Sequence, residues 1–189
     1  MAIQDPAELC PDERLREALS AIEDNPTQAL SSLPRLVDEF PTDPRLRFLT
    51  GSMLASAGRY NEARSEMRSA LRIAPDYAIA RFQLGLLELS SGEATAAETT
   101  WRALDDLPSD HPLRVMSAGL RSLARDQFVD AITQLERGIA LNTEHPPINH
   151  DMGMLITAIR THIEKEGPSS DTSAAHMLLQ QYKGGPTRH

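Results

Sequence analysis

The histidine and carboxylate side chains near residue 150 come closest, by type and spacing, to a reactive site. His145, His150 and Asp151 lie close together in the sequence, and His111 or His162 can be added if the chain folds back. Imidazole and carboxylate groups bind Zn²⁺, so one hypothesis for this segment is a metal centre. However, His111 and His145 each precede a proline at a corresponding turn, and His150 fits an ordinary helix face. We therefore expect no metal site here.

The other reactive groups are isolated. Cys10 is the single cysteine, which excludes an intramolecular disulfide, and a catalytic thiol needs a convergent base that the sequence does not display. Asp105 and Asp106 are adjacent, and neighbouring helix residues point in different directions. The sequence also lacks a phosphate-binding Gly-rich loop with Lys, a Gly-x-Ser-x-Gly elbow and a His-Glu-x-x-His pair. We expect neither an enzyme nor a cofactor.

Composition and charge narrow the classes of partner. Of the 189 residues, 40% are hydrophobic and 24% charged, which is ordinary for a globular domain. No apolar run approaches the roughly 18 residues that span a bilayer, and no secretory signal is visible. We expect a cytoplasmic protein without membrane insertion. The net charge is −8, and residues 1–43 hold ten acidic residues against three arginines, a net of −7. This balance disfavours nucleic acid as a ligand.

Small and large residues recur with a fixed interval along the chain. Glycines stand at 51, 85, 119 and 153, and alanines at 29, 63, 97 and 131, each 34 positions after the last (85 − 51 = 34). Apolar residues between them follow helical spacing, as in Leu46, Leu49 and Met53. Each unit is therefore predicted to be two antiparallel helices, in which a glycine lets the helix axes approach and a large residue such as Met67 or Trp101 fills the space beside it.

This pattern resembles the tetratricopeptide repeat (TPR). The residues that carry the resemblance best are Gly51-Ser52, Gly58-Arg59-Tyr60, Ala63, Ala70-Leu71 and Ala74-Pro75-Asp76. The resemblance implies an all-α, TPR-type right-handed superhelix of antiparallel helix pairs. The excess of Arg over Lys suggests a bacterial source.

The predicted organisation has three parts. A lead over residues 1–9 precedes a solenoid over 10–166, and residues 167–189 form a Gly/Pro break, a short helix and a tail. The solenoid units span about 10–43, 44–77, 78–111 and 112–145, with a partial unit over 146–166. The C-terminal helix, which ends near Tyr182, is expected to cap the solenoid, to lie in its groove, or to swap onto a neighbour and cause self-association.

The resemblance also implies a concave groove lined by the first helix of each pair. Carrying the family's inner positions onto this sequence gives Arg45, Phe48, Leu49, Ser52, Ile79, Phe82, Gln83, Leu86, Leu113, Met116, Ser117, Leu120, His150, Asp151 and Met154. About half of these are expected to be core, with Phe82, Met116 and Leu120 as the preferred groove residues. Apolar residues stand where chaperone adaptors of this family need cations, so we expect no carboxylate clamp. With Arg45, Arg81 and Arg114 at its flank, the strip suits a peptide or helix with apolar anchors.

These features predict a non-catalytic protein-interaction module, an adaptor, scaffold or assembly factor that binds a partner segment in the groove. Two alternatives remain open. One is a chaperone for a specific substrate protein, similar to the TPR chaperones of secretion systems. The other is a regulatory or substrate-presenting subunit of an enzyme complex. The fold alone does not choose among them.

Overall fold

The computed structural model describes residues 9–166 together with Leu178 and Leu179. Within this part of the chain every regular element is a helix, and the predicted all-α fold of antiparallel helix pairs is confirmed. Contacts divide the chain into two units, Met1–Ala80 and Arg81–His189.

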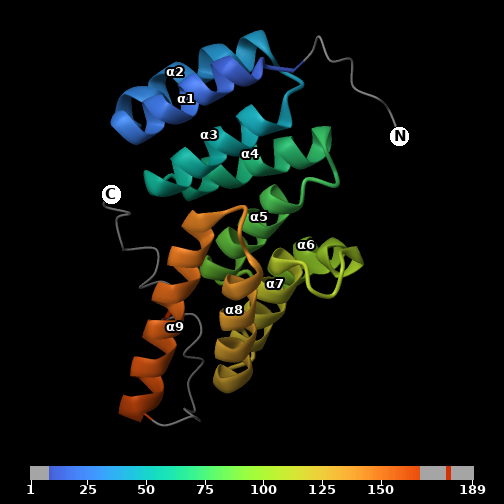
Figure 1. Ribbon diagram of the computed structural model, residues 1–189, viewed down its shortest axis with the longest axis vertical. Helices are drawn as coiled ribbons and strands as arrows, with labels where there is room; N and C mark the ends of the chain where they lie inside the picture. Colours follow the sequence, from blue (N-terminus) through green and yellow to red (C-terminus); the bar gives the residue numbers. More distant parts are fainter. Residues whose placement is uncertain (1–8, 167–177, 180–189) are drawn as a thin grey trace. The chain divides into compact units, whose positions relative to one another are not determined.

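The first unit holds two helix pairs. In Figure 1, α1 runs back along α2 and α3 runs back along α4, and α2 also contacts α3. The helices are α1 (Asp12–Asp24), α2 (Pro26–Glu39), α3 (Pro44–Ser56), α4 (Tyr60–Ile73) and the start of α5 (Ala78–Ser90).

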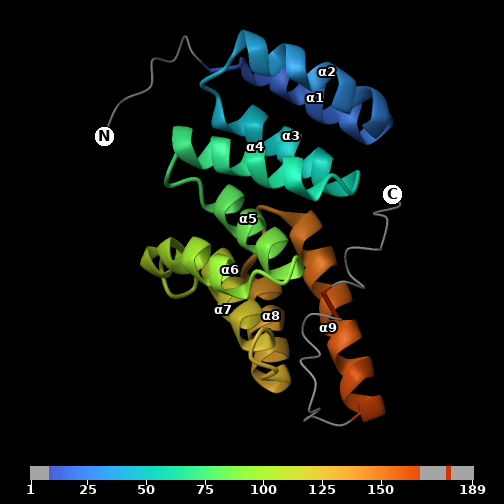
Figure 2. The same cartoon turned by 180° about the vertical axis from the view of Figure 1, so that it is seen from behind.

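The second unit contains the rest of α5 and the elements that follow it, seen from behind in Figure 2. They are α6 (Ala94–Trp101), the 3₁₀ helix η2 (Arg102–Asp106), α7 (Pro112–Leu123), α8 (Phe128–Leu141) and α9 (Pro146–Glu166). The helix α7 packs on both α8 and η2, and α8 packs on α9. Most of the predicted C-terminal helix lies outside the described residues, although Leu178 and Leu179 are described and buried.

The turns inside three successive helix pairs share one geometry. Gly58, Gly92 and Asp126 have positive φ of 75°, 82° and 55°, and the residue after each donates its N–H to a carbonyl five positions earlier, as from Arg59 to Leu54 at 2.8 Å. This is the hydrogen bond of a Schellman ending, which needs a left-handed residue. The 34-residue period thus places the same turn at corresponding sites.

The glycine column is explained by close packing between the two helices of a pair. A Cβ added to Gly51 would lie 3.0 Å from Met67 Cγ, and one on Gly85 would lie 2.2 Å from Trp101 Nε1. A Cβ added to Gly119 would lie 3.0 Å from Leu135 Cγ. The predicted pairing of a glycine with a large residue is therefore confirmed in three helix pairs. Gly153 differs, because no described atom lies within 4 Å of its added Cβ.

Candidate protein-binding surface

The face of α3 begins at a buried ionic network. Asp43 precedes the helix, is fully buried, and accepts hydrogen bonds from the backbone N–H of Arg45 at 2.9 Å and of Cys10 at 2.9 Å. The Arg45 guanidinium donates to Asp43 Oδ2 at 2.8 Å, to Asp12 Oδ1 at 2.8 Å and to the Cys10 carbonyl at 2.6 Å. This network caps α3 and joins it to Cys10 and to Asp12, the first residue of α1.

The network shifts the ionisation of its members. Burial raises the pKa of Asp43, but the hydrogen bonds from Arg45 and Cys10 outweigh it, so that the pKa is lowered overall. The hydrogen bond to Asp43 is the main cause that raises the pKa of Arg45. The Arg45 guanidinium is thus held by its own chain, and its predicted role as a cation beside the groove is replaced by a structural one.

The next turns of α3 present a half-buried apolar face. Phe48, Leu49 and Ser52 all keep part of their surface exposed. The Phe48 ring stands edge-on to Tyr77, with centroids 5.5 Å apart, and Ser52 Oγ donates to the Phe48 carbonyl at 3.1 Å. Burial raises the pKa of the Tyr77 phenol. We call Phe48, Leu49 and Ser52 the α3 face.

The corresponding residues on α5 and α7 are mostly buried. Gln83 alone of this group is half-buried, whereas the others expose less than a tenth of their surface: Ile79, Phe82, Leu86, Leu113, Met116, Ser117 and Leu120. Phe82, Met116 and Leu120, the residues preferred for the groove, are among the most completely buried in the chain. The side chains of Phe82, Met116 and Leu120 offer no surface to a partner. The groove role predicted for them is therefore corrected to core packing.

Contacts within the second unit explain two of these burials. The Trp101 indole donates to the Phe82 carbonyl at 3.0 Å, and the two rings lie 6.5 Å apart. Met116 lies over Gly138 of α8, where an added Cβ would be 2.4 Å from Met116 Cγ. Both side chains therefore fill space inside their own helix pairs.

The other two flanking arginines are also bound to their own unit. Arg81 donates to the Thr100 carbonyl at 3.3 Å, and Arg114 donates to the Leu107 carbonyl at the end of η2. On α9, by contrast, the predicted residues remain accessible: His150 and Met154 are exposed and Asp151 is half-buried.

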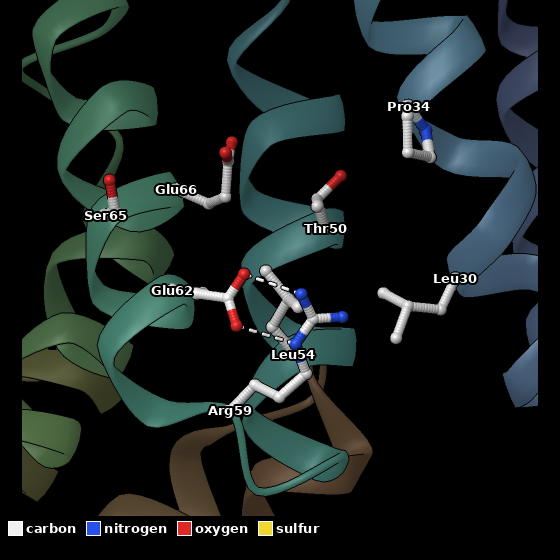
Figure 3. A pocket seen from close by; sticks show the side chains of 8 residues that line it. All are labelled: Leu30, Pro34, Thr50, Leu54, Arg59, Glu62, Ser65 and Glu66. Atoms are coloured by element: carbon white, nitrogen blue, oxygen red, sulfur yellow. Dashed lines mark hydrogen bonds and ion pairs between the residues drawn. The ribbon is translucent and has the colours of Figure 1, made fainter.

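A cleft that the sequence did not predict opens in the first unit between α2 and the α3–α4 pair. Its volume is about 290 Å³, and its lining comprises Leu30, Pro34, Thr50, Leu54, Arg59, Glu62, Ser65 and Glu66. Figure 3 shows the Arg59 guanidinium between Glu62 and Leu30, with Thr50 and Glu66 farther along the cleft. Arg59 binds both oxygens of Glu62, at 2.7 and 2.6 Å, and this hydrogen bonding is the main cause that lowers the pKa of Glu62.

Pro34 is the feature of the sequence that could have indicated this cleft. Pro34 stands inside α2, where proline removes a helical hydrogen bond and distorts the helix. None of the lining residues was a predicted site residue, because the repeat register directs attention to the first helix of each pair.

Neither a metal centre nor a membrane-spanning helix is found among the described residues. Among residues 9–166, 178 and 179, no three His, Cys, Asp or Glu side chains gather closely enough to hold a metal ion. In the same part of the chain, no helix combines the length and apolar character required to cross a membrane.

Comparison with known proteins agrees with the paired helices and their turns. The family model described as "Tetratricopeptide repeat" matches residues 15–78 and 58–112, which together cover more than half of the chain. The chain belongs to the tetratricopeptide repeat family. The predicted TPR-type fold is thereby confirmed, and the chain is a TPR protein-interaction module.

Two individual proteins are similar to this TPR chain. The human protein "Tetratricopeptide repeat protein 34" is 30% identical over 132 residues, which cover 66% of this chain and 23% of that protein. The chain thus spans about a quarter of that relative's length. The structure of "MamA 41-end from Desulfovibrio magneticus RS-1" superposes with a TM-score of 0.57 at 17% identity, covering 89% of this chain and 92% of that one. At that identity the likeness concerns the fold alone.

Proposed function

We propose that this chain is a non-catalytic adaptor or scaffold that holds a helix or extended segment of a partner protein against the α3 face. One observation carries the proposal. At equivalent places in the repeat, α3 leaves Phe48, Leu49 and Ser52 only half-buried, whereas α7 buries Met116, Ser117 and Leu120. A partner can reach apolar side chains on α3 that it cannot reach on α7.

The chemistry of the α3 face favours apolar anchors. Phe48 and Tyr77 supply a fixed aromatic pair, and Leu49 adds aliphatic surface beside it. Aromatic residues bury large areas with few rotamers to order, which suits them to an interface. The cationic Arg45 is committed to Asp43, Asp12 and Cys10, so recognition at this face rests on shape and apolar contact. His150, Asp151 and Met154 on α9 are kept as a separate candidate surface in the second unit.

Site-specific photocrosslinking tests the proposal. A benzoylphenylalanine is placed at Leu49 in the full chain, and in a matched protein it is placed at Val129, which is 67% exposed on α8. Both proteins are irradiated in the native host, and crosslinked peptides are identified by mass spectrometry. We expect position 49 to yield one recurring partner segment that contains apolar residues at helical or alternate spacing.

Two results would count against the proposal. If the same proteins crosslink from positions 49 and 129 in similar yield, the α3 face has no special role. If position 49 yields no crosslinked protein while a third protein with the benzoylphenylalanine at Met154 does, the working surface lies on α9.

A further inference from the structure

A phenolic hydroxyl lies next to the α3 face. It belongs to Tyr77, the residue directly before α5, in the first unit of the chain. The Tyr77 ring stands edge-on to Phe48, with ring centroids 5.5 Å apart, and the residue is half-buried. The contact with Phe48 restrains the ring, so the hydroxyl has a defined place beside the apolar side chains of the α3 face.

The hydroxyl of Tyr77 is open to a ligand. Within residues 9–166, 178 and 179, Tyr77 Oη makes no hydrogen bond. In the same part of the chain, no side-chain oxygen of a buried or half-buried residue is both shielded from solvent and without a hydrogen-bond partner. Solvent therefore reaches Tyr77 Oη. Because a tyrosine hydroxyl that becomes buried ordinarily requires a partner, a segment that covers this face must supply one.

The phenol acts as a hydrogen-bond donor. Burial is the main cause that raises the pKa of Tyr77, and the negative charge of Asp43 raises it further. The oxygen therefore keeps its proton at neutral pH. The aromatic ring also withdraws electron density from the oxygen, so that a phenol donates a hydrogen bond more readily than it accepts one. The matching group of a partner is an acceptor.

Charge favours a neutral acceptor over a carboxylate. Residues 1–43 of the same unit have a net charge of −7, and the carboxylate of Asp43 is close enough to act on the phenol. The Arg45 guanidinium, which could compensate a negative partner, is bound to Asp43 and Asp12. The neutral acceptor that every residue of a partner carries is its backbone carbonyl.

A helix and an extended segment differ in how many carbonyls they can offer. Inside a helix each carbonyl is bound to the N–H four residues later, and only those of the last turn are left. In an extended segment the carbonyls are free to bind another group, and alternate side chains point to the same side. Such a segment can therefore direct apolar side chains at Phe48 and Leu49 and a carbonyl at Tyr77.

We propose that the Tyr77 hydroxyl donates a hydrogen bond to a backbone carbonyl of the partner, which therefore lies on the α3 face as an extended segment rather than as a helix. Apolar residues at alternate positions of that segment contact Phe48 and Leu49. This inference rests on the proposed function, because it concerns the form of the segment that is held at the same face.

Calorimetry with the synthetic segment that crosslinks from position 49 tests the role of the hydroxyl. Tyr77→Phe removes the oxygen and keeps the aromatic pair with Phe48. We expect the dissociation constant of this variant to rise about fivefold, the effect of one lost hydrogen bond. The matched control is Tyr60→Phe, which removes a hydroxyl from a half-buried tyrosine on α4 of the same unit and should leave the affinity unchanged. Circular dichroism first establishes that both variants are as helical as the wild type.

A set of segments in which one amide at a time is replaced by an ester locates the carbonyl. An ester carbonyl is a weaker acceptor than an amide carbonyl. We expect one of these esters to weaken binding to the wild type and to have a clearly smaller effect on binding to Tyr77→Phe, because the two changes remove the same hydrogen bond. The sequence of the segment should show apolar residues at alternate positions.

Three results would overturn the inference and leave the proposed function intact. The first is equal affinity of the wild type and Tyr77→Phe for a segment that Leu49→Glu no longer binds. The second is an equal loss of affinity in Tyr60→Phe and Tyr77→Phe, and the third is a segment whose apolar residues follow helical spacing. If Leu49→Glu and Tyr77→Phe both bind the segment as the wild type does, the proposed function fails together with the inference.

Discussion

The helices α3 and α7 occupy the same place in their repeats but present their equivalent residues differently. Each starts at a proline after a capping residue, Asp43 or His111. Yet Phe48, Leu49 and Ser52 on α3 are only half-buried, whereas Met116, Ser117 and Leu120 on α7 are buried. The register determines which residues share a helix face, and the elements packed on that face determine whether a partner can reach it.

The largest difference between the two faces is expected when a charge is placed on each of them. Met116→Glu buries an uncompensated carboxylate over Gly138, and we expect it to cost about 4 kcal/mol or more of unfolding free energy. Leu49→Glu places its charge on a half-buried face that solvent still reaches and should cost less, about 1–2 kcal/mol. Urea unfolding followed by circular dichroism measures both. Equal losses would show that the α3 face is as much core as α7.

The glycine column provides a second contrast. In Gly85→Ala the new methyl would lie 2.2 Å from Trp101 Nε1, and we expect a loss of about 3 kcal/mol from overpacking. In Gly153→Ala no described atom lies within 4 Å, and the better helix propensity of alanine should raise stability by about 0.5–1 kcal/mol. Thermal unfolding of the two variants measures the difference. A destabilised Gly153→Ala would show that this face of α9 is covered.

The ionic network at the start of α3 has no counterpart of the same composition on α7, where His111 Nδ1 caps the helix instead. Arg45→Ala leaves the buried Asp43 without its guanidinium, and we expect a loss of about 2 kcal/mol. Cys10 is buried beside it, and burial is the main cause that raises the pKa of its thiol. The reaction of Cys10 with a disulfide reagent should therefore be slow in the wild type and faster in Arg45→Ala. The conservative Arg45→Lys should restore the slow reaction only in part, and unchanged rates in both variants would contradict the role of the network.

The same network makes stability depend on acid. The pKa of Asp43 is lower in the folded than in the unfolded chain. Its contribution is therefore complete above the unfolded value, about 4, and is lost as the pH falls through the lower folded value. The urea midpoint should drop between pH 5 and pH 3 by more in the wild type than in Asp43→Asn, which retains a capping side chain. Identical pH profiles of the wild type and Asp43→Asn would show that Asp43 does not cause the loss of stability in acid.

The sequence predicted the helix pairs, the turns and the glycine packing, because all of these depend on local spacing and residue size. Trp101 was correctly assigned to the core for the same reason, since it shares a register with Met67 and Leu135. The groove residues could not be separated from core residues in this way. The Phe82 ring lies beside the Trp101 ring, and Met116 fills the space that Gly138 leaves by having no side chain.

The ionic network and the cleft were out of reach for a different reason. Arg45 looked like a groove cation because its partners Cys10 and Asp12 lie 35 and 33 positions away in the sequence. The cleft depends on three helices, and only the proline inside α2 marked it in the sequence.

The affinity of the partner segment crosslinked from position 49 tests the central claim most directly. Calorimetry with the synthetic segment compares the wild type, Leu49→Glu and the surface control Val129→Glu, once circular dichroism has shown that all three are equally helical. We expect Leu49→Glu to weaken binding at least about tenfold, or about 1.4 kcal/mol, and Val129→Glu to leave it unchanged. Equal affinity of the wild type and Leu49→Glu would contradict a binding surface on α3.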